Sequence, residues 1–221
     1  MCFSATASFT SAGILGVIGV ACLARASSAR EWPVAAAPLI FALQQSIEGL
    51  LWLNLLETPE GWRSQGLTSL FLFFAEVFWP IYVPIAVLLI EPSRERRRLI
   101  YVCLTAGLSV GAHLLWGVLT LPHAAKIIDD HIVYFTEQKA SNIVAAAYLA
   151  STALPLMLSS RRTVAMLGAI VFVGSIVAYV VYWDAFVSVW CFFAAATSGV
   201  ILFHFEQSRR RLGLADARGL I

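Results

Sequence analysis

Charged residues are scarce in this sequence. Asp, Glu, Lys and Arg make up only 13% of the 221 residues, whereas hydrophobic residues make up 60%. Soluble domains carry about 25% charged residues, so this composition excludes a soluble domain and favours a multi-pass membrane protein. The net charge of +2 then reflects sidedness in a membrane, and no nucleic-acid partner is expected.

Cysteine motifs are also missing. The four cysteines, at positions 2, 22, 103 and 191, form no CxxC pair and no other paired spacing, which speaks against a disulfide framework or a zinc ribbon. Cys22 and Cys103 lie toward the inner ends of apolar runs, where we expect them to pack as small apolar side chains. Only Cys2 and Cys191 belong to the outer half.

Apolar runs long enough to cross about 30 Å of hydrocarbon as helices fill most of the chain. Seven can be placed, at 8–26, 33–56, 66–90, 99–121, 142–159, 163–183 and 185–206. We therefore expect an all-α fold in which residues 1–221 form a single bundle of seven transmembrane helices. The longest polar connection, roughly 122–141, is expected outside the membrane, either with a short interfacial helix or lid over 127–136 or as a solvated loop.

Basic residues predict which side each connection occupies. All but three of the fifteen Lys and Arg residues fall in the first, third and fifth connections or in the C-terminal tail; the exceptions are Arg63, Lys126 and Lys139. Cytoplasmic segments retain Lys and Arg, so we expect the N-terminus outside and the C-terminus in the cytoplasm. The arginine runs are expected to contact anionic membrane lipids.

Three ionisable residues interrupt apolar runs at similar depths. Glu48, Glu76 and His113 lie roughly 12 to 15 Å below the outer ends of their runs, at 1.5 Å per residue. An ionisable side chain in hydrocarbon costs a few kcal/mol, so each one should face the protein interior and have a partner. We therefore expect them to converge in an outward-opening polar pocket.

Other polar and aromatic residues recur around these three positions. Gln44 and Gln45 share or flank the helical face of Glu48, and a tryptophan follows each ionisable residue at a spacing of three or four, at Trp52, Trp79 and Trp116. Indole groups can wall a cavity and donate hydrogen bonds to carboxylates. An interfacial aromatic belt is the alternative interpretation.

The residue types of this layer suit a metal site. Carboxylates, an imidazole and thiols are ligands for zinc or another divalent metal ion, and we predict five metal ligands: Glu48, Glu76, His113, Cys191 and Cys2. Glu48 and Glu76 are also predicted as catalytic, because a carboxylate that does not bind the metal can act as a general base. The structural alternatives are a hydrogen bond between helices for Glu48, capping of backbone groups freed by Pro80 for Glu76, and a satisfied core histidine for His113.

Three classes of function follow from such a pocket. A metal-dependent membrane enzyme is the first, and a receptor that binds a metal or a small molecule from the outer side or the bilayer is the second. A receptor pocket is expected to be mostly apolar with few polar anchors. A proton-coupled transporter is the third, but it needs a polar path through the inner half, where the sequence has few ionisable groups.

The sequence also contains the strings MCFSATASF, QQSIEGLLW, AEVFWPIYVP, HLLWG and SVWCFFAA. They resemble a bacterial family of integral membrane proteins of uncharacterised function, and the resemblance runs along the whole chain. It implies seven helices in a bacterial inner membrane and no particular reaction. Zinc-dependent seven-helix hydrolases do not match, because the last run offers only His204, and microbial rhodopsins do not match, because the last run has no lysine.

Overall fold

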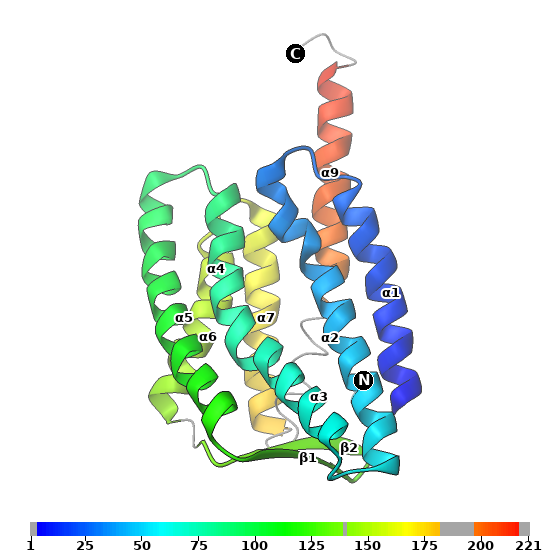
Figure 1. Cartoon of the computed structure of the whole chain (residues 1–221). Helices are drawn as coiled ribbons and strands as arrows, with labels where there is room; N and C mark the ends of the chain where they lie inside the picture. Colours follow the sequence, from blue (N-terminus) through cyan, green and yellow to red (C-terminus); the bar gives the residue numbers. More distant parts are fainter. Residues whose placement is uncertain (1–3, 139–140, 182–196, 217–221) are drawn as a thin grey trace.

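The computed structural model describes residues 4–138, 141–181 and 197–216. Its helices pack side by side and run in alternating directions between two ends of a bundle (Figure 1). They are α1 (Ala5–Leu23), α2 (Trp32–Glu57), α3 (Trp62–Leu72), α4 (Trp79–Ile90), α5 (Arg94–Thr120), α6 (Asn142–Met157), α7 (Arg162–Val181) and α9 (Ser198–Asp216). A 3-10 turn, η1 (Ala29–Glu31), precedes α2, and a π-helix, η2 (Phe73–Phe78), joins α3 to α4.

Within these ranges, four helical segments are long and apolar enough to cross a membrane. They are Ala5–Leu23, Ala29–Glu57, Trp62–Ile90 and Arg94–Thr120. The described parts of α6 and α7 are apolar but shorter. The all-α prediction is therefore confirmed for the described chain, apart from one β-hairpin, whereas seven crossings remain a prediction.

Helix boundaries agree with the apolar runs except where helices extend into charged sequence. α2 matches the run 33–56 to within one residue at each end, but α5 begins at Arg94 rather than at residue 99. The Ser93 hydroxyl accepts a hydrogen bond from the Arg96 N–H, and such an N-cap stabilises a helix start inside polar sequence. α9 likewise continues to Asp216, and the beginning of the run 185–206 lies outside the described residues.

The connection predicted over roughly 122–141 contains a β-hairpin, so neither the short interfacial helix considered for 127–136 nor a plain solvated loop is present there. We call this end of the bundle outer and the opposite end inner, after the topology predicted from the sequence. β1 (His123–Ile128) pairs with β2 (His131–Thr136) in antiparallel register around a two-residue turn. Asp129 and Asp130 have φ values of 47° and 58°, the left-handed conformation that a tight hairpin turn requires and that Asp tolerates. The reason lies in the spacing, because Ala125, Ile127, Ile132 and Tyr134 alternate onto one face.

That face of the hairpin covers the outer ends of α2 and α3 (Figure 1). Ile132 is fully buried against an apolar cluster that includes Leu51 and Leu55 of α2. The Tyr134 ring stacks on Phe71 of α3 at a centroid distance of 4.7 Å. The hairpin therefore forms a roof over this end of the bundle.

The helical segment from α3 through η2 to α4 is irregular around Pro80. In a π-helix the Ala75 carbonyl would pair with the N–H five residues later, but that residue is Pro80, which has none. The Tyr148 hydroxyl of α6 donates to this carbonyl instead. Where α5 packs on α4, a Cβ on Gly107 would lie only 1.9 Å from the Pro80 carbonyl oxygen. Glycine is therefore required for α5 to pack this closely.

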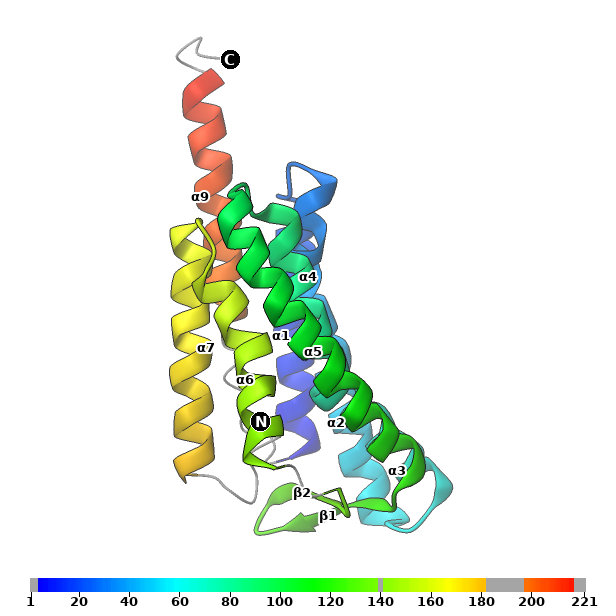
Figure 2. The same ribbon diagram turned by 90° about the vertical axis from the view of Figure 1, so that its left-hand side faces the viewer.

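The remaining helices complete the bundle on both sides of α2 and α4. α1 packs along α2, and α9 contacts α1, α2 and α7. α6 lies against both α4 and α5, with α7 beside it (Figure 2). Cys22 and Cys103 are buried and form no disulfide, as predicted from their positions near the inner ends of their helices.

Candidate functional site

One face of α2 changes character along the helix. Beneath the hairpin it is apolar, with Leu55, Trp52 and Leu51 buried. The next turns carry the polar residues Glu48, Gln45 and Gln44, which are at most 1% exposed. Further inward the face is apolar again, and its residues border a cavity: Phe41, Ala37, Val34 and Pro33.

The polar layer is held by two side-chain hydrogen bonds. The Trp79 indole of α4 donates to Gln44 Oε1 at 2.8 Å, and Gln45 Nε2 donates to Glu48 Oε2 at 3.2 Å. The first bond joins α2 to α4, and the second holds the Glu48 carboxylate against its own helix. Glu48 is therefore a fully buried carboxylate inside a long apolar segment.

Two buried polar atoms in this region have no hydrogen-bond partner among the described residues. They are the Gln45 amide oxygen, Oε1, and the Trp52 indole nitrogen, Nε1. Gln45 is 1% exposed and Trp52 is 5% exposed. A buried polar group left unpaired costs about 1 to 3 kcal/mol. Two such atoms on one face of α2, on either side of Glu48, therefore need an explanation.

Packing contacts place the three predicted site residues at a common level. α4 runs antiparallel to α2, and the Gln44–Trp79 bond sets their register. One turn outward from this bond, Glu48 on α2 and Glu76 in η2 lie at about the same depth in the bundle. On α5, Gly111 approaches Val77, which brings His113 to about the same level. The shared depth expected from the sequence is therefore also present in the packing.

Among the described residues, these three are not gathered into a metal site, and the pocket in which they converge stays a prediction. Glu48 is buried, Glu76 is half-buried and His113 is exposed. Within the described ranges, no three His, Cys, Asp or Glu side chains are grouped closely enough to hold a metal ion. Cys2 and Cys191 lie outside the described residues.

The orientation of α5 explains the position of His113. The buried positions of this helix include Gly107, Val110, Gly111 and Leu114, which lie three and four residues apart and form its packed face. His113 belongs to the exposed side, together with Trp116, which is 58% exposed. Because α5 packs closely through its glycines, the His113 imidazole points away from the interior of the bundle.

Glu76 does not have the capping role that was one interpretation of its position. The carbonyl freed by Pro80 belongs to Ala75, and the Tyr148 hydroxyl satisfies it. Glu76 lies in the π-helical turn itself. Such turns occur frequently at functional sites.

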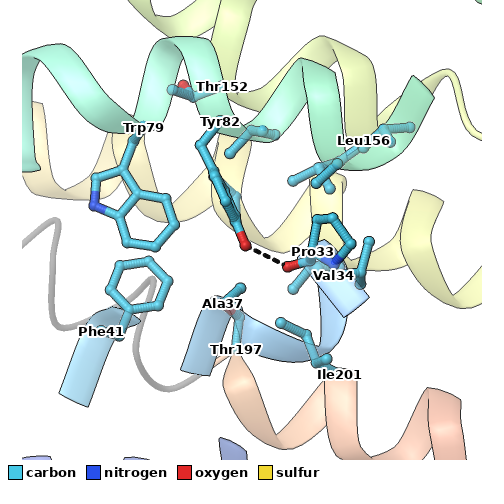
Figure 3. Close-up of a pocket in the computed structure, with 15 residues that line it drawn as sticks. Pro33, Val34, Ala37, Phe41, Trp79, Tyr82, Thr152, Leu156, Thr197 and Ile201 are labelled. Carbon is cyan, nitrogen blue, oxygen red and sulfur yellow. Dashed lines mark hydrogen bonds between the residues drawn. The ribbon is translucent and has the colours of Figure 1, made fainter. Parts of the chain in front are cut away.

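An apolar cavity of about 70 Å³ lies inward from the polar layer. Phe41 and Trp79 border it at one end, where their rings stack with centroids 4.0 Å apart (Figure 3). Helices α2, α4, α6, α7 and α9 contribute its other walls, which include Val34, Ala37, Ala86, Leu156, Val171 and Ile201. Of the three tryptophans expected to wall a cavity, Trp79 borders this one and Trp52 and Trp116 do not, and the cavity lies inward from the polar layer.

Hydroxyl groups on the cavity wall already have partners. The Tyr82 hydroxyl donates to the Pro33 carbonyl at 2.6 Å, as the dashed line in Figure 3 shows. The Thr152 hydroxyl donates to the Tyr148 carbonyl within its own helix. The protons of these two hydroxyl groups are therefore already used, and most of the remaining cavity wall is hydrocarbon.

Two ion pairs connect charged groups at the inner end of the bundle. Arg25 Nε lies 3.1 Å from Glu206 Oε2, which joins α1 to α9. Arg161 Nη1 lies 3.6 Å from Glu31 Oε1. The position of His204 is similar, because its imidazole is hydrogen bonded to Thr163 of α7.

Glu91 connects two of the inner turns. It is 2% exposed, and its carboxylate accepts hydrogen bonds from the Ser93 N–H and from both the N–H and the hydroxyl of Ser160. Burial by itself raises the pKa of Glu91, but the hydrogen bonds from Ser160 and Ser93 outweigh it and hold the pKa below its usual value. This carboxylate is therefore a saturated structural group.

The model of one protein family matches residues 1–217, and its description is "Family of unknown function (DUF6629)". The chain belongs to this family. The DUF6629 match extends over all of the predicted site residues, including Cys2 and Cys191, and it confirms the resemblance to an uncharacterised family. No curated protein and no solved structure matches the chain.

Sequence reasoning missed two features of the region around Glu48. The hairpin was missed because a mixed polar and apolar stretch of this length, residues 123–136, suits either a helix or a pair of strands. The alternation of apolar residues around Asp129 and Asp130 was a signal for strands. The unpaired atoms of Gln45 and Trp52 were missed because hydrogen-bond partners depend on neighbouring helices. Only the spacing of these residues around Glu48 was visible in the sequence.

Proposed function

We propose that this protein binds a small amphiphilic molecule within a multi-pass membrane bundle. Gln45, Glu48 and Trp52 form the polar end of the binding site, and the space next to Phe41 and Trp79 receives the apolar part. The molecule arrives from the outer side or from the surrounding bilayer. Binding is the conclusion that the geometry supports best.

The unpaired Gln45 Oε1 and Trp52 Nε1 carry this proposal. Each one costs free energy while it lacks a partner, and both flank a fully buried carboxylate. A bound molecule that supplies the missing hydrogen bonds removes this cost. The neighbouring apolar cavity adds support, because few polar anchors beside mostly apolar walls are typical of small-molecule sites.

The other functional classes receive less support. A transporter needs a polar path inward, and the cavity on that side is lined mainly by hydrocarbon. Metal-dependent catalysis with zinc, with Glu48 or Glu76 as general base, stays a prediction of the sequence. Metal analysis of the purified wild type and of the Glu48→Gln variant tests it, and a wild type without stoichiometric metal would rule it out.

The proposal includes a topology of seven crossings in a bacterial inner membrane, with the N-terminus outside and the C-terminus in the cytoplasm. The alternation of connections between two ends of the bundle supports it (Figure 1). So does the arginine-rich end that contains Arg25, Arg96 and Arg161, opposite the hairpin. A C-terminal fusion tests the topology, because green fluorescent protein should fluoresce there and alkaline phosphatase should be inactive.

Native mass spectrometry of the protein released from nanodiscs tests ligand binding. We expect wild type to carry a small-molecule adduct that the Gln45→Leu variant has lost. Gln65→Leu is the matched control, because Gln65 is exposed on α3 and the chemical change is the same. Equal adducts in wild type and Gln45→Leu, or no adduct in wild type, would contradict the proposal.

A further inference from the structure

We propose that the bound molecule is a neutral amphiphile whose head group carries hydroxyl or amide groups and whose hydrocarbon chain occupies the cavity beside Phe41 and Trp79. This inference rests on the proposed function and adds the chemical class of the ligand.

The unpaired atoms are of opposite kinds. An indole N–H can only donate a hydrogen bond, so Trp52 requires an acceptor on the ligand. The Gln45 amide donates through Nε2 to Glu48, so its orientation leaves the oxygen Oε1 unpaired. Gln45 therefore requires a donor on the ligand.

This pair of requirements excludes simple ions as the group that completes the site. A cation cannot accept the Trp52 N–H, and an anion cannot donate to Gln45 Oε1. Hydroxyl and amide groups both donate and accept, so they satisfy both atoms.

The geometry of α2 brings the two atoms to the same region. Positions 45, 48 and 52 are three and four residues apart and therefore share one face. Side chains on a helix lean toward its N-terminus, so the Trp52 indole extends over the turn of Glu48. The head group is thereby placed beside the Glu48 side chain.

The roof above this position keeps the head group away from bulk water. Trp52 belongs to the same apolar cluster as Ala125 and Ile132 of the hairpin. A hydrogen bond in such a sheltered place is stronger than one exposed to water. Discrimination between head groups is therefore expected to be large.

A hydrocarbon chain fits the other end of the site. Phe41 lies one helical turn, about 6 Å, inward from Gln45, and it borders the apolar cavity. The hydroxyls of Tyr82 and Thr152 on the wall are already hydrogen bonded to carbonyl groups. The cavity wall is therefore mainly hydrocarbon, without a free proton on either hydroxyl, and it can bury methylene groups.

Three probes with the same ten-carbon chain test the head group: monodecanoylglycerol, decanoate and decyltrimethylammonium. Binding to wild-type protein in nanodiscs is measured as a saturable shift of the thermal unfolding midpoint. We expect monodecanoylglycerol to bind at least about tenfold more tightly than either charged probe, which corresponds to one hydrogen bond. Trp52→Phe and Gln45→Leu should each lose this preference, whereas Gln65→Leu should retain it.

A chain-length series tests the position of the tail. Shortening the monoacylglycerol from ten to six carbons should weaken binding by about fourfold per methylene. In the Ala37→Phe variant, which fills part of the cavity, binding should no longer depend on chain length. The preference for a neutral head group should remain, which shows that this variant is folded.

The outcomes separate the two proposals. If a charged probe binds most tightly, the chemical class is wrong while a ligand site remains. If affinity does not change with chain length in wild type, the tail does not occupy the cavity. If no probe binds saturably and wild type carries no adduct in the mass spectrometer, both proposals are overturned.

Discussion

The two polar regions of this bundle differ in how completely their groups are paired. At the inner end, the carboxylates of Glu31, Glu91 and Glu206 each contact an arginine, a serine or a backbone N–H. In the outer polar layer, Gln45 and Trp52 each keep one buried atom without a partner. Saturated groups hold helices together, whereas unsaturated groups cost stability and are retained where they bind something.

The positions of the two regions agree with this division. The inner groups connect turns that are distant in sequence, such as Glu91 with Ser160. The outer groups lie on one face of a single helix, between the hairpin roof and the apolar cavity. The paired groups at the inner end therefore connect helices, and we call them the clasp. The outer layer is where we propose the binding site. Three substitution or pH experiments can break or sharpen this comparison.

The largest effect is expected for Glu91→Ala. The change leaves two N–H groups and a hydroxyl, from Ser93 and Ser160, without their acceptor. We expect a loss of about 3 kcal/mol in the free energy of unfolding, measured by denaturation in detergent micelles. Glu95→Ala is the control, because Glu95 is exposed one turn away and its loss should cost under about 1 kcal/mol. Equal losses would remove the distinction between clasp and surface.

An intermediate effect is expected for a matched pair of tryptophans. Trp79 and Trp52 are 2% and 5% exposed, but only the Trp79 indole has a hydrogen-bond partner, Gln44. Substitution by Phe removes a similar apolar area at both positions. We expect Trp79→Phe to destabilise the unliganded protein by about 1 to 2 kcal/mol more than Trp52→Phe, measured as above.

The outcome of this pair bears directly on the outer layer. A cost for Trp52→Phe that matches or exceeds the cost for Trp79→Phe would show that the Trp52 N–H is paired in the unliganded protein. The region would then resemble the inner clasp, and the argument for an unsaturated site would be lost.

The smallest effect is the acid sensitivity of the clasp. Because the folded state lowers the pKa of Glu91 below its ordinary 4.5, the carboxylate contributes stability that is fully present above about pH 5 and is lost as the pH falls through the lowered pKa. We expect the unfolding midpoint of wild type to fall between about pH 5 and pH 3 by more than that of Glu91→Gln. Identical profiles for the two proteins would contradict the assigned hydrogen bonds.

Much of the fold could be predicted from the sequence because a bilayer constrains it strongly. Long apolar runs must form helices in which the backbone bonds to itself, and α2 followed its predicted range to within one residue at each end. The depth of Glu48 relative to Glu76 could also be predicted, since helical rise is uniform. The hairpin could not, because the fourteen residues 123–136 do not form a long apolar run to which this constraint applies.

The candidate site was less predictable than the fold. His113 was expected to face the interior of the bundle, but α5 packs through its glycine face, which leaves His113 exposed on the opposite side. Which side of a helix packs depends on the shape of its neighbours, here on the close approach of Gly107 to Pro80. A single sequence does not show that shape.

The sequence by itself determined that this chain forms apolar helices, which end carries the arginines, and that Glu48 lies inside an apolar helix. These properties follow from composition, length and helical rise, which act locally. The tertiary structure alone decided that the hairpin covers α2, that Glu48 and His113 face different surroundings, and that Gln45 and Trp52 keep unpaired atoms. The reason is that burial and hydrogen-bond pairing depend on side chains from several helices, which come together only when the bundle packs.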